Sequence, residues 1–122
     1  MSTRTASGLV QCQIDGFNAQ DLDAATSIYA PDATLVIVSP HTLPGSELRL
    51  EGFERITKHL GRAIAGGLRD VVLDWVGEGD GFVAWRDSGV FGTDTAFSES
   101  HLARLNDDGL VVEHWIHSIY AR

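Results

Sequence analysis

Residues 95–121 read TAFSESHLARLNDDGLVVEHWIHSIYA, and apolar and polar side chains alternate along two segments within them. A period of two is typical of β-strands that are covered on one face. The segments are joined by Asn106-Asp-Asp-Gly109, and an Asp-Gly pair between alternating segments is a strong hairpin signal. This stretch therefore predicts two long antiparallel strands, over residues 95–106 and 110–121.

The sequence upstream predicts the rest of the sheet and the helices that cover it. Two further long strands and two short ones are expected, over residues 69–77, 81–91, 33–38 and 47–51. Apolar residues at helical spacing predict three helices, over residues 6–18, over residues 21–30, and from Gly52 to the Gly66-Gly67 pair. The expected class is α+β, with the helices on one face of the sheet.

Composition and charge exclude several kinds of partner. A chain of 122 residues predicts one domain, residues 1–122, and a hydrophobic share of 43% is ordinary for a globular protein. Nine Lys and Arg against 17 Asp and Glu give a net charge of -8, which disfavours binding to nucleic acid or to an anionic membrane. The chain has one cysteine and opens without a signal-peptide pattern, so we expect a cytoplasmic protein without an internal disulfide.

Four passages resemble the nuclear-transport-factor-2-like superfamily and, within it, the SnoaL-like and ketosteroid-isomerase-like enzymes. They are Phe17-Asn-Ala-Gln-Asp-Leu-Asp23, Tyr29-Ala-Pro-Asp-Ala-Thr34, Gly52-Phe-Glu-Arg-Ile56 and Asn106-Asp-Asp-Gly-Leu-Val-Val-Glu-His-Trp115. The resemblance covers nearly the whole chain and implies a cone-shaped barrel, in which a strongly curved, mixed and mostly antiparallel sheet packs on three N-terminal helices and encloses a pocket. It also implies a homodimer through the convex sheet face, and a site that works without metal or other cofactor.

The chain departs from the best-known members of that superfamily. Ketosteroid isomerases carry a base Asp where this chain has Leu35–Val38, a Tyr near Gln13, and a second Asp at the position of His101. SnoaL-like cyclases often carry an Asp at the position of Ile116. These differences argue against a steroid isomerase and against the standard cyclase mechanism, so the function must be inferred from the site itself.

Strand alternation and the family register together place a polar cluster on the inner face of the sheet, made of Arg86, Glu99, His101 and His114. In the functional interpretation, His101 is a general base or acid, and His114 or Arg86 stabilises an oxyanion. Glu99, with a pKa raised by burial, is the alternative base. In the structural interpretation, the four groups only satisfy one another, with Arg86 and Glu99 as a buried ion pair.

The other candidate residues belong to the expected cavity and to the expected dimer interface. The substrate-binding set consists of Phe17, Tyr29, Val36, His41, Ile56, Leu60, Ile116 and Ser118. The convex face is expected to present Trp85, Trp115 and His117 to a second copy of the chain. Glu99, His101 and His114 are ligand types of a non-haem iron site, but no metal is expected there. His59 is expected at the surface.

Two functions are compatible with this sequence. The first is a cofactor-independent enzyme that isomerises, cyclises or dehydrates a small hydrophobic carbonyl compound, or opens an epoxide. The second is a dimeric ligand-binding or assembly module that uses the same cavity without turnover. The missing acids at positions 37 and 116 favour the second function. The ionisable groups at inward positions favour the first, because burying them without a use would cost stability.

Overall fold

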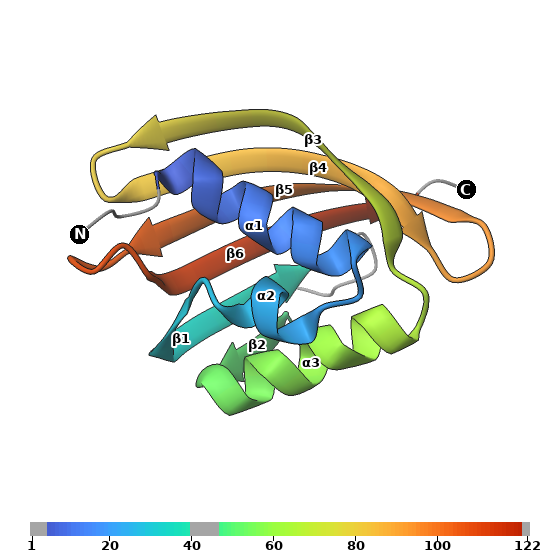
Figure 1. The fold of residues 1–122 in the computed structure, drawn as a ribbon, viewed down its shortest axis with the longest axis horizontal. Coiled ribbons are helices and arrows are strands. Elements are labelled where there is room, and N and C mark those ends of the chain that lie inside the picture. The colour runs from blue at the N-terminus through green and yellow to red at the C-terminus, as the bar shows by residue number, and fades with distance from the viewer. Residues whose placement is uncertain (1–4, 40–46, 121–122) are drawn as a thin grey trace.

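The computed structural model describes residues 5–39 and 47–120, and a curved sheet forms its centre (Figure 1). The sheet has six strands in the order β2-β1-β6-β5-β4-β3. Only β1 and β6 run parallel among the neighbouring strands, so the expected mixed and mostly antiparallel sheet is confirmed. The strands are β1 (Tyr29–Val38), β2 (Leu48–Glu51), β3 (Arg69–Gly79), β4 (Phe82–Phe91), β5 (Thr95–Leu105) and β6 (Val111–Tyr120).

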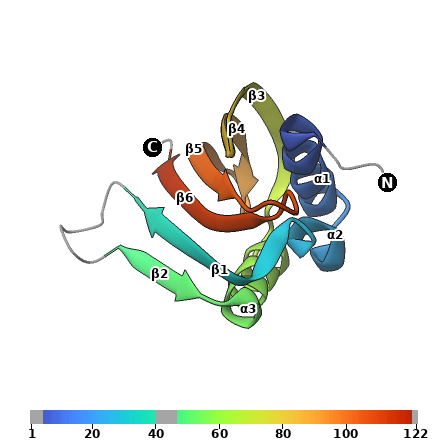
Figure 2. The ribbon, with the colours of Figure 1, turned by 90° about the vertical axis from the view of Figure 1, so that its left-hand side faces the viewer.

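Three helices complete the described fold, namely α1 (Ala6–Asn18), α2 (Leu22–Thr26) and α3 (Phe53–Ala65). The side chains of Thr5 and Asp21 cap the first two by accepting hydrogen bonds from the N–H groups of Gly8 and Ala24. Figure 2 shows the sheet curling around α1 and α2, with α3 at its lower end, without closing into a full barrel. None of the described helices is long and apolar enough to cross a membrane.

Two residues near the end of α1 fix its position. Gly16 permits close contact with α2, because a Cβ added there would lie 2.6 Å from the backbone nitrogen of Ala25. Asn18 donates from Nδ2 to the carbonyl of Val71 on β3 and accepts from the N–H of Val71, each at 2.8 Å. These contacts hold α1 over the inner face of the sheet, where the apolar core lies, including Leu9, Val10, Ile14, Leu35, Val83 and Trp85.

The second helix is shorter than expected, and Tyr29 lies in a strand instead. The sequence predicts a helix to Ala30, whereas α2 ends at Thr26 and β1 begins at Tyr29. Pro31 disfavours the helical conformation for the residue before it. The N–H of Val111 on β6 donates to the carbonyl of Ile28 at 2.8 Å, so this segment pairs with a distant strand. The side chain of Tyr29 is therefore buried in the core.

The two faces of β4 are the reverse of the expectation. Alternation was expected to turn Arg86 inward and to leave Trp85 and Asp87 on the convex face. In the structure Trp85 pairs with His101 and Asp87 with Glu99, and Trp85 and Asp87 are both buried. Arg86 is exposed on the opposite face. A shift of register by one residue moves every side chain of a strand to the other face, which accounts for the whole error.

Candidate functional site

A cavity of about 450 Å³ lies between the inner face of the sheet and the helices. That volume is within the usual range for sites that bind small molecules. Eight of the residues expected from the sequence line the cavity, namely Phe17, Tyr29, Leu60, Glu99, His101, His114, Ile116 and Ser118. The wall also includes residues that were not expected there, namely Gln13, Ile37, Leu48, His59, Arg62, Ala63, Leu68, Phe91 and Phe97.

Three residues of the expected substrate-binding set, Val36, Ile56 and His41, are not among the described residues that line the cavity. Val36 pairs with Trp115 in the parallel ladder between β1 and β6, which turns it to the outer face, and its neighbour Ile37 lines the cavity instead. Ile56 is completely buried in the core on α3 and does not reach the cavity wall. His41 lies outside the described residues.

Arg86 does not belong to the cluster either. Its Nε donates to Oγ of Ser98 at 3.0 Å on the outer face of the sheet. The expected ion pair with Glu99 is therefore wrong, and so is the expectation that Arg86 stabilises an oxyanion in the cavity.

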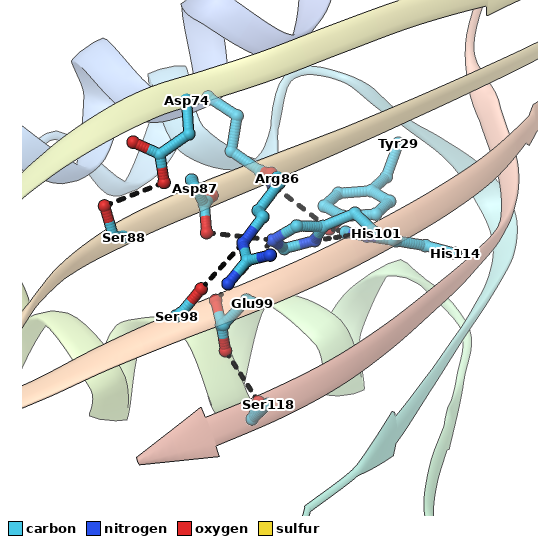
Figure 3. A network of polar contacts seen from close by, with 11 residues as sticks. Tyr29, Asp74, Arg86, Asp87, Ser88, Ser98, Glu99, His101, His114 and Ser118 are labelled. Carbon is cyan, nitrogen blue, oxygen red and sulfur yellow. Dashed lines mark hydrogen bonds and ion pairs between the residues drawn. The ribbon is translucent and has the colours of Figure 1, made fainter. Parts of the chain in front are cut away.

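Five buried polar side chains on five elements form a chain of hydrogen bonds at the inner end of the site, most of it visible in Figure 3. Nε2 of Gln13 on α1 lies 3.0 Å from the hydroxyl of Tyr29, which lies 2.8 Å from Nδ1 of His114. Nε2 of His114 lies 2.9 Å from Nδ1 of His101, and Nε2 of His101 lies 3.1 Å from Oδ1 of Asp87. Every ring nitrogen of the two histidines thus has a partner.

The direction in which hydrogen bonds are donated along this chain follows from its first two members, Gln13 and Tyr29. The amide of Gln13 donates to the carbonyl of Ala25 and to Tyr29, and burial raises the pKa of Tyr29, so the phenol keeps its proton and donates to His114. Burial, and then the neighbouring His101, hold the pKa of His114 well below 6.5, so this imidazole is neutral. Accepting at Nδ1, it carries its proton on Nε2 and donates to His101. His101 in turn presents an Nε2–H group to Asp87.

Glu99 lies beside the end of this chain and lines the cavity. Its Oε1 is 3.6 Å from Nε2 of His101, and its Oε2 accepts from Oγ of Ser118 at 2.8 Å. Burial raises the pKa of Glu99, and the charge of Asp87 adds to this, against the opposing effects of His101 and Ser118. Glu99 is the only carboxylate among the described residues that line the cavity.

Asp87 and Trp85 were missed as parts of the site, although the sequence contains a signal for both. The loop of residues 92–94 places Phe91 opposite Thr95, so odd-numbered residues of β4 face odd-numbered residues of β5.

The rings of Trp85 and His101 stack with centroids 4.5 Å apart and an interplanar angle of 4°. Nε1 of Trp85 is buried without a hydrogen-bond partner among the described residues.

The group able to hold a metal also differs from the expected one. Ligand atoms of Asp87, Glu99 and His101 lie within 4.8 Å of one another. His114 is not part of this group, because its Nε2 faces His101 instead. Two carboxylates and an imidazole suit a divalent cation, which would have to displace the proton on Nε2 of His101.

The chain resembles several solved structures over nearly its full length. A SnoaL-like protein of unknown function from Burkholderia thailandensis has 25% identity and a TM-score of 0.72, covering 100% of this chain and 99% of that one. An NTF2-like protein of unknown function from Mesorhizobium loti has 19% identity and a TM-score of 0.73, covering 97% and 95%. Another, from Cytophaga hutchinsonii, has 18% identity and a TM-score of 0.72, covering 98% and 93%.

These likenesses concern the fold, and no curated protein matches the chain. The family comparison is more specific, because the model of the SnoaL-like domain matches residues 10–114. That range contains α2, α3, the strands β1 to β5, parts of α1 and β6, and every residue of the hydrogen-bonded chain from Gln13 to Asp87. The protein is a member of the SnoaL-like domain family.

Proposed function

We propose that this protein is a cofactor-independent acid/base enzyme that acts on a small hydrophobic molecule bearing a carbonyl group or an epoxide. The observation that carries the proposal is the carboxylate of Glu99. It lines an otherwise largely apolar cavity, and its pKa is raised by burial. A carboxylate with a raised pKa is suited to accept a proton near neutral pH.

In the proposed reaction, Glu99 takes a proton from a carbon next to the carbonyl group. The electrons of the broken C–H bond move into an enolate, and the proton stays on Glu99. Return of that proton to a different carbon completes an isomerisation. In a cyclisation, the enolate carbon attacks a second carbonyl, whose π electrons move to its oxygen, and Glu99 returns the proton to that alkoxide. For an epoxide, Glu99 would take the proton of the attacking water while the water oxygen bonds to a ring carbon and that carbon's bond to the epoxide oxygen breaks; the resulting alkoxide would then take the proton from Glu99.

The two histidines differ in their proposed roles. His101 presents Nε2–H toward the carboxylates of Asp87 and Glu99, so it acts as a hydrogen-bond donor next to the base, and Glu99 takes the role of base. His114 is a positioning residue, because it fixes the tautomer of His101 through Nδ1. Of the two bases that the sequence left open, the tautomer supports Glu99.

The test is turnover of a panel of enones, β-keto compounds and epoxides by wild type and by Glu99→Gln. General acid–base catalysis contributes about 100-fold to 10,000-fold, so the variant should lose at least about 100-fold in kcat. Activity should rise with pH through the raised pKa of Glu99, and it should survive a chelator. Lys58→Gln, on the exposed side of α3, is the matched control. Full activity in Glu99→Gln would remove Glu99 from the mechanism.

A binding module without turnover is the second candidate. The observation in its favour is that both nitrogens of His101 and of His114 are already engaged within the protein. This candidate predicts that ligands of the panel bind to wild type and to Glu99→Gln with similar affinity and that neither protein turns any of them over.

We also propose that two copies of the chain pair through the convex face of the sheet, and we expect the protein to be cytoplasmic. Trp85 was expected at that interface but faces the interior, whereas His117 is exposed and Trp115 is partly so. The face exposes further large apolar side chains, namely Val72, Trp75, Phe82, Leu102 and Ile119. Such a patch is typical of an interface. Light scattering should show a dimer that Leu102→Glu dissociates and Phe53→Glu, on α3, does not.

A further inference from the structure

We infer that the ligand of the cavity carries a carboxylate group, which Arg62 binds where the cavity meets solvent. This inference rests on the proposed function, in that it takes the cavity to be a ligand site, and it narrows the class of ligand. The ligand would then be an apolar keto acid or epoxy acid, with its reactive carbon near Glu99 and its acid group near α3.

The first observation is the distribution of polar groups on the cavity wall. Glu99, His101 and Ser118 come from the two central strands β5 and β6. On α3, His59 and Arg62 line the cavity together with Leu60. The rest of the wall is mostly apolar and includes Phe17, Ala63, Leu68, Phe91, Phe97 and Ile116. A ligand that matches this wall is apolar in its middle and polar at both ends.

The second observation is that Arg62 has no carboxylate partner among the described residues, in a chain with a net charge of -8. Among the described arginines, Arg49, Arg69 and Arg104 each pair with an acid, whereas Arg55, Arg62 and Arg86 do not. Arg62 is also the only Arg or Lys among the described residues of the cavity wall. A guanidinium group binds a carboxylate through two parallel hydrogen bonds, which makes it well suited to this ligand group.

The negative charge of Glu99 determines the orientation of such a ligand, that is, which end of the cavity its carboxylate group occupies. A carboxylate placed next to Glu99 would be repelled in a partly buried site, whereas next to Arg62 it would be attracted. The acid group therefore belongs at α3, and the carbonyl group or epoxide belongs at the strands. This orientation brings the reactive carbon to the proposed base.

His59 supplies a readout that is independent of turnover. It is half-buried, and burial together with the charge of Arg62 lowers its pKa. An anion bound between α3 and the cavity would offset the charge of Arg62 and favour the protonated imidazole. A neutral ligand of the same shape would add only burial, which acts in the opposite direction. The two kinds of ligand should thus move the pKa of His59 in opposite directions.

The test compares octanoate with octanamide, which have the same chain length and differ in charge. Calorimetry gives the Kd of each for wild type, for Arg62→Gln and for the control Lys58→Gln. An exposed ion pair contributes up to about 1 kcal/mol, so octanoate should bind more tightly than octanamide, by up to about fivefold. Arg62→Gln should remove that preference and Lys58→Gln should keep it. NMR titration should show octanoate raising the pKa of His59.

Each other outcome overturns the inference in a distinguishable way. Equal binding of the two probes, unaffected by Arg62→Gln, would refute the carboxylate site and leave the cavity as a ligand site. A preference for octanoate that persists in Arg62→Gln would place the acid group elsewhere. Binding of neither probe at millimolar concentration would count against the cavity as a ligand site at all. Loss of turnover in Glu99→Gln tests the proposed chemistry separately.

Discussion

Removal of the Tyr29 hydroxyl should destabilise the fold mainly through one neighbour, the imidazole of His114. In Tyr29→Phe, Nδ1 of His114 loses its 2.8 Å hydrogen bond while the ring stays buried. A buried polar atom left without a partner costs about 1–3 kcal/mol. His114→Phe breaks two bonds, because the O–H of Tyr29 loses its acceptor and Nδ1 of His101 loses its donor, while the Tyr29 oxygen still accepts from Gln13. The expected cost of that variant is about 2–6 kcal/mol.

The double variant tests whether these costs come from a direct contact. With Phe at both positions, the hydroxyl and Nδ1 of His114 are both absent, and Gln13 keeps its bond to the carbonyl of Ala25. The free energy of unfolding should then fall by about 2–3 kcal/mol less than the sum of the two single effects. Urea denaturation followed by circular dichroism measures all four proteins. Additive effects, within about 0.5 kcal/mol, would refute the hydrogen-bonded chain.

A matched control and a pH series make the same experiment more specific. Tyr29→Phe combined with Ser100→Ala, on the exposed side of β5, should show additive effects. Because the folded-state pKa of His114 is lowered below 6.5, the unfolded chain binds the proton more readily. Stability contributed by this group is lost as the pH falls below 6.5, by up to about 1.4 kcal/mol per pH unit. His114→Phe should therefore lose less stability than wild type between pH 6.5 and pH 5, and an equal loss would contradict the assignment.

Two other variants test the charge of Glu99 and the packing of the helices. The raised pKa of Glu99 means that the folded state binds its proton more readily than the unfolded state, so stability falls as the pH rises through that pKa. Glu99→Gln should consequently have a larger free energy of unfolding than wild type at pH 8, by about 1.4 kcal/mol for each unit of the shift, and a lower Tm for the variant would contradict this. Gly16→Ala should cost about 1–3 kcal/mol, because its Cβ would meet the backbone of Ala25. Gly61→Ala, whose Cβ would meet only the end of the Leu22 side chain at 3.3 Å, should be neutral or stabilising in the same urea titration, and the reverse order would refute the packing argument.

Local patterns in the sequence were enough to predict most of the elements. The first helix was expected over residues 6–18, and α1 spans Ala6–Asn18. The hairpin at residues 106–109 connects β5 and β6 as expected, because the Asp-Gly turn and the alternation on both sides are local signals. Alternation and the family register together predicted correctly that Glu99, His101 and His114 share the inner face of the sheet.

Pairing between distant segments decided what local patterns could not. Alternation shows that Arg86 and Asp87 lie on opposite faces of β4, but both faces of this strand mix polar and apolar residues. Only the register against β5 turned Asp87 inward, opposite Glu99. In the same way, Tyr29 was expected at the cavity but in a helix, and pairing of its backbone with β6 placed it in a strand instead, which no residue near Tyr29 reveals.

The sequence by itself thus determined the spacing of apolar residues in each segment, and with it most of the helices and strands. Its motifs also indicated the family and, with it, the histidines of the inner face. The tertiary structure decided which face each remaining strand presents, and so assembled the chain from Gln13 to Asp87. The physical reason is that alternation is a property of one strand, whereas the choice of face depends on the strand beside it. The tautomer of His101 follows only from that assembled neighbourhood, because each donor in the chain is oriented by the one before it.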